Sequence, residues 1–227
     1  MKAALYGLVL AVLVGWGQAA AKIAVSPVLH EEARVQAGQR FAVTCHHRGE
    51  EPLEVEASLA LFDQDAWGKA VFLDDQDSVA RAEQLLSVHP RRFWLEPGAK
   101  EVVQVEVVQD SFEHLYAVLF LKPVQSSLQT RLAVLFLLST GSGEAALDVA
   151  SWAHRGEALT LQVENSGGSH GLWAGELLLF DGDGRLGDTM QVRSGVVLPG
   201  RSRGLEVSLP SWVEKVEIRP LQFGGGP

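Results

Sequence analysis

The stretch that decides the fold spans residues 92–108 and reads RFWLEPGAKEVVQVEVV. Pro97 presets φ to about −65° and Gly98 can adopt a positive φ, so the pair predicts a type II turn. After the turn, apolar and polar residues alternate, which is typical of a strand with one buried face. We expect the buried side chains to be Val103, Val105 and Val107, with Gln104 and Glu106 facing solvent.

A second copy of this pattern indicates an internal duplication. Residues 197–207 read VLPGRSRGLEV, again a Pro-Gly turn followed by alternation. Residues 59–65, LALFDQD, are likewise echoed by residues 177–183, LLLFDGD. Because these features recur in the same order, we expect two units of roughly 100 residues each, an ordinary domain size.

The composition predicts an all-β protein. Of the 227 residues, 47% are hydrophobic and 21% are charged, which provides enough apolar material for one or two cores. The 23 glycines and 9 prolines punctuate short alternating runs, and no helical period is evident after the N-terminal segment.

The N-terminus has the pattern of a secretory signal peptide. A basic Lys2 precedes an apolar run, and small residues at 19 and 21 fit cleavage before Lys22. A membrane anchor is the alternative, but the run is short for a span and no stop-transfer pattern follows. We therefore expect residues 1–21 to be removed and the protein to be exported to the periplasm or cell envelope, without stable membrane insertion.

The charge balance excludes some partners. Removing the signal peptide takes away one lysine and no acid, so the net charge changes from −9 to −10. An acidic protein does not favour nucleic acid or anionic lipid as a partner. The single cysteine, Cys45, has no partner for an internal disulfide, and we expect it to be a buried strand residue.

The mature chain is predicted to divide into domains 22–140 and 141–221, with a flexible tail at 222–227. A long apolar strand, Leu128 to Leu138, is expected to end the first domain. Residues 22–28 are predicted to form a single first strand, interrupted at Pro27 and therefore at a sheet edge. The polar segment Asp74 to Glu83 is expected to be a loop or short helical turn.

Three motifs, in order along the chain, resemble those of a known family. These are Leu95-Glu96-Pro97-Gly98, Gln129-Thr130-Arg131-Leu132 and Asn165-Ser166-Gly167. The chain resembles the periplasmic pilus-assembly (PapD-like) chaperones over nearly all of residues 22–220. The resemblance implies an L-shaped pair of immunoglobulin-like β-sandwich domains without enzymatic activity, which lends a strand to an incomplete secreted subunit. Tyr116 would then hydrogen-bond back across the corner of its own sandwich, or else serve as a packing aromatic.

The sequence departs from that family at the anchor positions. The family holds the subunit's terminal carboxylate with an arginine on the first strand and a lysine on the last strand of domain one. Residues 22–32 contain no arginine, and the lysine's place falls at Ala133. Arg131 lies two residues earlier, hence on the same strand face, and could substitute. The donor hairpin is also short, because only residues 124–127 separate Pro123 from the predicted strand.

The predicted partner-binding surface lies on that strand. Its residues are Leu128, Thr130, Leu132 and Val134 on one face, with Arg131 and Ala133 on the other. At a sheet edge, the strand would pair with an extended segment of a secreted subunit while Arg131 neutralises a carboxylate. The alternative is an ordinary paired strand with a solvated Arg131.

Two other functions fit the same domains. One is a structural or adhesive envelope protein in which the domains act as spacers. The other is a carbohydrate-binding module, which needs an exposed aromatic platform. The candidates for that platform are Trp67, Trp94, Trp152, Trp173 and Trp212.

Catalytic and metal motifs are not predicted to function. Residues 167–171 spell a nucleophile elbow, but a strand follows where the elbow needs a helix. Residues 182–187 match the dinucleotide-binding fingerprint, but no βαβ unit surrounds them. Residues from Asp181 onward resemble the start of a calcium-binding loop, but its twelfth position is Val192, where a bidentate Glu is needed. The seven histidines show no ligand spacing. We expect no enzymatic activity, no metal and no cofactor.

Overall fold

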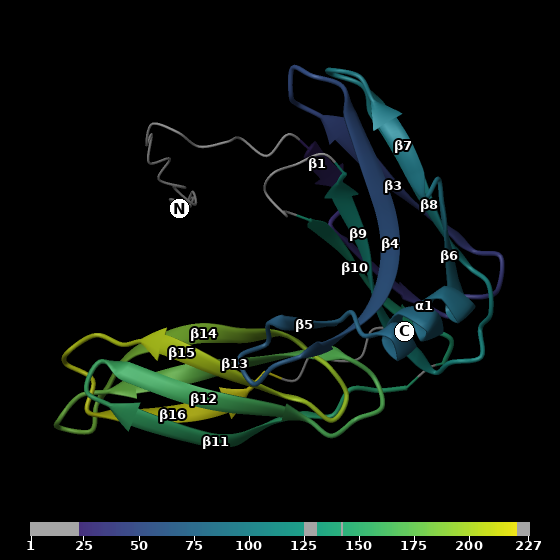
Figure 1. Cartoon of the computed structure of the whole chain (residues 1–227). Coiled ribbons are helices and arrows are strands. Elements are labelled where there is room, and N and C mark those ends of the chain that lie inside the picture. The colour runs from purple at the N-terminus through teal and green to yellow at the C-terminus, as the bar shows by residue number, and fades with distance from the viewer. Residues whose placement is uncertain (1–22, 125–130, 142, 222–227) are drawn as a thin grey trace, which may run out of the picture.

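The computed structural model describes residues 23–124, 131–141 and 143–221. Strands make up almost all of its regular structure, so the prediction of an all-β protein with two immunoglobulin-like sandwiches is confirmed. Figure 1 shows two arms set at an angle, the first built from β1–β10 and the second from β11–β16. The predicted signal peptide, the predicted tail, Leu128 and Thr130 lie outside the described residues.

The first arm consists of two sheets packed around one apolar core. One sheet has the order β1-β3-β8-β6, with bounds Ile23–Ser26, Arg40–His47, Lys100–Val107 and Leu86–His89. The other has the order β2-β10-β9-β4-β5, with β7 also pairing with β4, and bounds Leu29–Ala33, Leu132–Ser139, His114–Pro123, Leu53–Gln64, Ala70–Leu73 and Arg92–Leu95.

The second arm is a smaller sandwich of the same plan. Its sheets have the orders β11-β12-β15 and β14-β13-β16, with bounds Leu147–Arg155, Ala158–Asn165, Ser202–Ser208, Leu186–Val197, Gly171–Phe180 and Lys215–Pro220. A Pro-Gly turn precedes β15 as one precedes β8, and the glycines have positive φ values of 65° at Gly200 and 76° at Gly98. Each of these strands then pairs with an early strand of its arm, β12 or β3.

The predicted first strand is in fact two strands in two sheets. β1 pairs with β3 and ends at Ser26, and the Ser26–Pro27 peptide bond is cis. After Pro27 the chain crosses to the opposite sheet, where β2 runs parallel to β10. Proline has no N–H for a ladder, so the interruption was expected, but the second strand was not.

The polar segment after β5, predicted to be a loop or short helical turn, is a regular helix of 10 residues. The helix α1 spans Gln76–Leu85. The side chain of Asp75 caps its N-terminus by accepting hydrogen bonds from the backbone N–H and hydroxyl of Ser78. Ala82 and Leu85 are buried against the core of the first arm, which anchors the helix at the lower end of that arm (Figure 1).

Candidate functional site

The candidate site is the edge of β10, which is only partly covered. On one side β9 pairs with β10 along its whole length, from Leu132 to Ser139. On the other side β2 pairs only with the second half of the strand, from Leu135 onward. Among the described residues, no strand pairs with the first half of β10 on that side.

The backbone of Ala133 faces this open edge. The Leu135 N–H donates to Val28 O across the β2 side at 3.0 Å, and the Val35 N–H donates to Ser139 O on the same side at 2.9 Å. Backbone groups of every second residue in a strand point the same way. The N–H and C=O of Ala133 therefore project from the sheet edge ahead of the start of β2.

The side chains of β10 divide into two faces. Val134 is fully buried in the core of the first arm, and Leu132 packs at the border of that core. Ala133 and Leu135 pack on the outer face, against a cluster that includes Phe120. Because the side chain of Val134 is buried and its backbone faces β9, Val134 cannot touch a partner. This part of the edge can offer only the backbone of Ala133.

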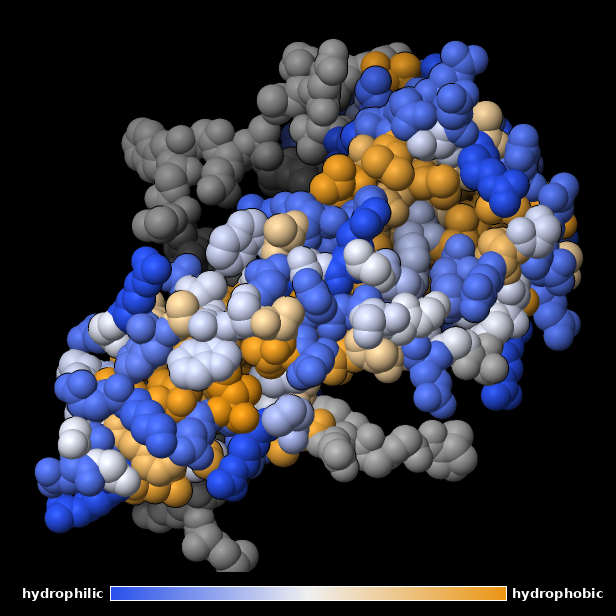
Figure 2. Space-filling view, turned by 90° about the horizontal axis from the view of Figure 1, so that it is seen from below, coloured by the Kyte–Doolittle hydropathy of each residue, from blue (hydrophilic) through white to orange (hydrophobic). Residues whose placement is uncertain are grey.

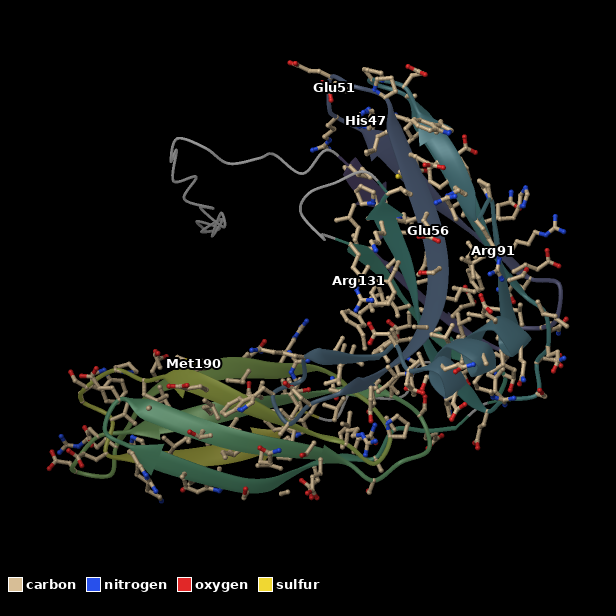
Figure 3. The ribbon with its side chains drawn as sticks, in the orientation of Figure 1. His47, Glu51, Glu56, Arg91, Arg131 and Met190 are labelled. Carbon is tan, nitrogen blue, oxygen red and sulfur yellow. The ribbon has the colours of Figure 1, made fainter. Side chains whose placement is uncertain are left out.

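Arg131 is stacked and paired rather than solvated. Its guanidinium lies 3.8 Å from the centroid of the Phe120 ring on β9, and its Nη2 is 2.6 Å from Oδ2 of Asp74, which follows β5. The side chain thus leans across β9 toward β5, away from the open edge. It nevertheless faces the angle between the two arms (Figure 3) and remains partly exposed.

Two exposed apolar residues lie beside the open edge. Val28 and Leu29 are 61% and 41% exposed, and Leu29 is the register partner of Leu135. Seen from below, apolar surface is exposed on both arms (Figure 2). Sequence reasoning missed this pair because it ended the first strand at Val28, although the proline before it was a signal that the chain changes direction.

The joint between the arms is apolar at its centre. Leu198 of the second arm is buried in a cluster with outer-face residues of the first arm, namely Ala60, Phe62, Val118, Phe120 and Leu137. A polar chain borders this cluster, because the Tyr116 hydroxyl lies 3.4 Å from Nδ1 of His170, and Nε2 of His170 lies 3.1 Å from Oε1 of Glu31. Tyr116 therefore bridges the arms instead of closing a corner of its own sandwich.

Burial and hydrogen bonding determine the ionisation of the groups at this joint. Burial raises the pKa of Tyr116 to about 12 and lowers the pKa of His114, whose ring stacks on that of Tyr116. The hydrogen bond from Arg201 holds the pKa of Asp63 below its usual value. At neutral pH the tyrosine and His114 are thus neutral, and Asp63 is a carboxylate paired across the joint.

Burial raises the pKa of the Cys45 thiol to about 12, which makes it a poor nucleophile. Among the described residues, no three His, Cys, Asp or Glu side chains are grouped to hold a metal. No helix in the described part of the chain is long and apolar enough to cross a membrane.

The tryptophans are spread over both arms. Trp173 is buried, whereas the exposed ones come from both arms and from four different segments. Two of the exposed tryptophans already pack on glycines of the second arm: Trp67 lies against Gly204, and Trp212 lies against Gly187.

Solved structures share the fold. One is the crystal structure of the class 5 fimbriae chaperone CfaA, whose sequence is 12% identical to this chain. The two structures match with a TM-score of 0.56 over 90% of this chain and 94% of CfaA. This chain is also 12% identical to a chain of the chaperone–tip adhesin complex of CFA/I fimbriae biogenesis, with a TM-score of 0.55 over 88% and 94% of the two chains. No family model matches the sequence, and no curated protein does. The fold is thus the tandem immunoglobulin-like sandwich of the fimbrial chaperones.

Proposed function

We propose that the protein is an exported, non-enzymatic chaperone that pairs an extended segment of a pilus or surface subunit with the open edge of β10. The observation that carries the proposal is the backbone of Ala133, which no strand in the described part of the chain pairs on the β2 side, at a sheet edge beside the angle between the arms. The proposed surface comprises Leu128, Thr130, Arg131 and Leu132 together with the backbone of Ala133. Val134, which was predicted to belong to it, has a buried side chain and a backbone that faces β9, so it only positions its neighbour Ala133. The fold shared with fimbrial chaperones supports the same function.

The chemistry of such a surface is β-augmentation. An incoming strand gains main-chain hydrogen bonds from the edge, and its alternate side chains gain contact with nearby apolar surface. The exposed side chains of Val28 and Leu29 provide that surface where β2 begins. Because β2 covers the edge from Leu135 onward, the incoming segment must end or turn there.

Arg131 has a supporting role in this proposal. Stacking on Phe120 fixes the guanidinium plane, and its ion pair with Asp74 leaves other N–H groups toward the angle between the arms. A carboxylate of the bound segment could accept a hydrogen bond from one of these N–H groups. We also propose that residues 1–21 are the signal peptide and that the domains are 22–140 and 141–221.

The alternatives have less support. A structural or adhesive role would use both arms as spacers, and it leaves the open edge without a purpose. A carbohydrate-binding module would need aromatic rings on one surface, whereas the exposed tryptophans lie on separate segments of both arms.

The proposal is tested by a proline placed at the open edge. Ala133→Pro removes the N–H that faces the edge but none that pairs with β9, so the strand should remain folded. The mature protein is used to capture proteins from the native cell envelope, which are then identified by mass spectrometry. We expect the wild type to capture small secreted subunits and Ala133→Pro to capture at least about tenfold less, the loss that ~1.4 kcal/mol would produce.

Two further variants make the test specific. Ala133→Ser keeps the backbone N–H and should capture as the wild type does. Arg131→Ala should weaken capture if a carboxylate of the subunit reaches the guanidinium. If the wild type captures no secreted subunit, the spacer role replaces the chaperone proposal.

A further inference from the structure

We propose that the β4–β5 hairpin is a brace that fixes the angle between the two arms. The hairpin extends from the first arm and lies along the second (Figure 1). Its contacts with the second arm come from three consecutive places: the end of β4, the tip of the hairpin and the apolar face behind it.

Gln64, the last residue of β4, is bonded to the second arm by both ends of its amide. Its Nε2 donates to Val196 O at 2.8 Å, and its Oε1 accepts from the Leu198 N–H at 3.2 Å. The side chain therefore pairs with the backbone of the second arm as a neighbouring strand would. Such a two-point contact fixes orientation as well as distance.

Asp63, the residue before Gln64, forms a bidentate ion pair with Arg201 of the second arm. Asp63 accepts from Nε of Arg201 at 2.7 Å and from Nη2 of the same guanidinium at 2.5 Å. Bidentate geometry of this kind adds direction to the attraction. Arg201 follows the Pro-Gly turn of the second arm, so the duplicated turn serves here as a contact point for the first arm.

The tip of the hairpin is seated on β15. The Gly204 N–H donates to Ala66 O at 2.7 Å, and the ring of Trp67 covers the same glycine. A Cβ at position 204 would come within 2.8 Å of the Trp67 ring, closer than such atoms approach. Glycine is therefore required at this position for the tip to sit where it does.

A second contact holds the other edge of the same sheet. Glu31, on β2, meets His170 of the second arm, while Gln64 lies near the opposite edge. Contacts at two separated edges, with the buried Leu198 between them, oppose rotation of one arm on the other. Domains joined in a chain move relative to each other unless their interface prevents it, and here the brace supplies that restraint.

The brace is tested by measuring the distribution of distances between the arms in the full mature protein. Dyes for single-molecule energy transfer are attached to cysteines introduced by Val102→Cys and Leu186→Cys, two exposed positions in different arms. The native Cys45 can stay, because it is fully buried and burial raises its thiol pKa to about 12. The labelled protein should show one narrow distribution.

Two independent variants remove the brace. Asp63→Ala combined with Gln64→Ala removes the polar contacts of β4, and Gly204→Val displaces the tip from the opposite side. Each is expected to widen the distribution by about twofold or more, as for arms free to move. Arg40→Ala, which breaks an exposed ion pair with Glu106 inside the first arm, is the matched control and should leave the width unchanged.

An unchanged distance distribution in both variants would overturn the brace. If circular dichroism shows that both variants are folded and the distribution remains as narrow as in the wild type, the hairpin does not set the angle. Since this measurement needs no partner, a failed capture experiment would leave the brace intact, and a failed brace would leave the open edge of β10 intact.

Discussion

At the scale of single residues, His114 is the most unusual group in the joint. Both of its ring nitrogens are buried and have no hydrogen-bond partner among the described residues. Burial is the main cause of its lowered pKa; Glu113 opposes the shift, and the charge of His170 adds to it. His114 therefore accepts a proton less readily in the folded protein than in the unfolded chain.

This environment predicts a dependence of stability on pH. Because the folded pKa lies below the unfolded value of about 6.5, the contribution of His114 is complete above that pH and is lost as the pH falls through and below it. His114→Phe keeps an aromatic ring beside Tyr116 and cannot be protonated. Urea unfolding at neutral pH and at about pH 5, the lower limit of histidine's usual range, should show a smaller loss of stability in the variant than in the wild type.

His30 is the internal comparison for this experiment. Burial lowers its pKa in the same direction, so the variant should retain part of the pH dependence. Equal losses of stability in His114→Phe and in the wild type would contradict the assignment to His114.

Some residue roles could not be predicted from the sequence. Arg131 was placed on the correct strand face, but its partner Asp74 is far from it in the chain, and nothing local signals the pair. Tyr116 was expected to bond within its own sandwich, whereas its contact, His170, depends on how the arms meet. Such contacts are set by tertiary structure, which periodicity does not encode.

At the scale of elements, the alternating strands were the most predictable feature. On β8, the three alternate valines are fully buried and face the core, as the period of two indicates. The two features that were missed have physical reasons. The helix α1 has few apolar residues, so its period is weak, and β2 is defined by pairing with β10, a strand about 100 residues later.

The register of β8 predicts two very different costs for neighbouring substitutions. Val105→Ala should lower the free energy of unfolding by ~2 to 4 kcal/mol, because it leaves a cavity in a packed core. Glu106→Ala should cost about 0.5 kcal/mol or less, because it breaks only an exposed ion pair with Arg40. Denaturant unfolding of both variants measures the difference, and equal costs would show that the face assignment is wrong.

At the scale of the whole molecule, the number of arms could be predicted from the residues, whereas the angle between them was implied only by the family resemblance. The repeated Pro-Gly turns and alternating strands indicated two similar units from the sequence alone. The angle depends on the contacts of Asp63, Gln64 and Ala66 with residues over a hundred positions away, which leave no periodic trace. The open edge of β10 was harder still to predict. Whether a strand has a free edge depends on how far its neighbour extends, and β2 stops short of the first half of β10.

The proposed domain boundary leads to a test on an isolated first arm. The core of β1–β10 is made only by residues of that arm, so a fragment of residues 22–140 should fold by itself. We expect a β-sheet circular dichroism spectrum and a cooperative thermal transition.

Separation should also expose the surface that the second arm now covers. Without Leu198, the outer-face residues Phe62, Val118 and Phe120 lose part of their apolar contact. A contiguous exposed apolar patch favours association, so the fragment should sediment as a larger species at high concentration, whereas Phe62→Ser in the fragment should reduce that association. A disordered spectrum for residues 22–140 would contradict the two-domain division, and a folded fragment that remains monomeric would show that the uncovered apolar face does not drive association.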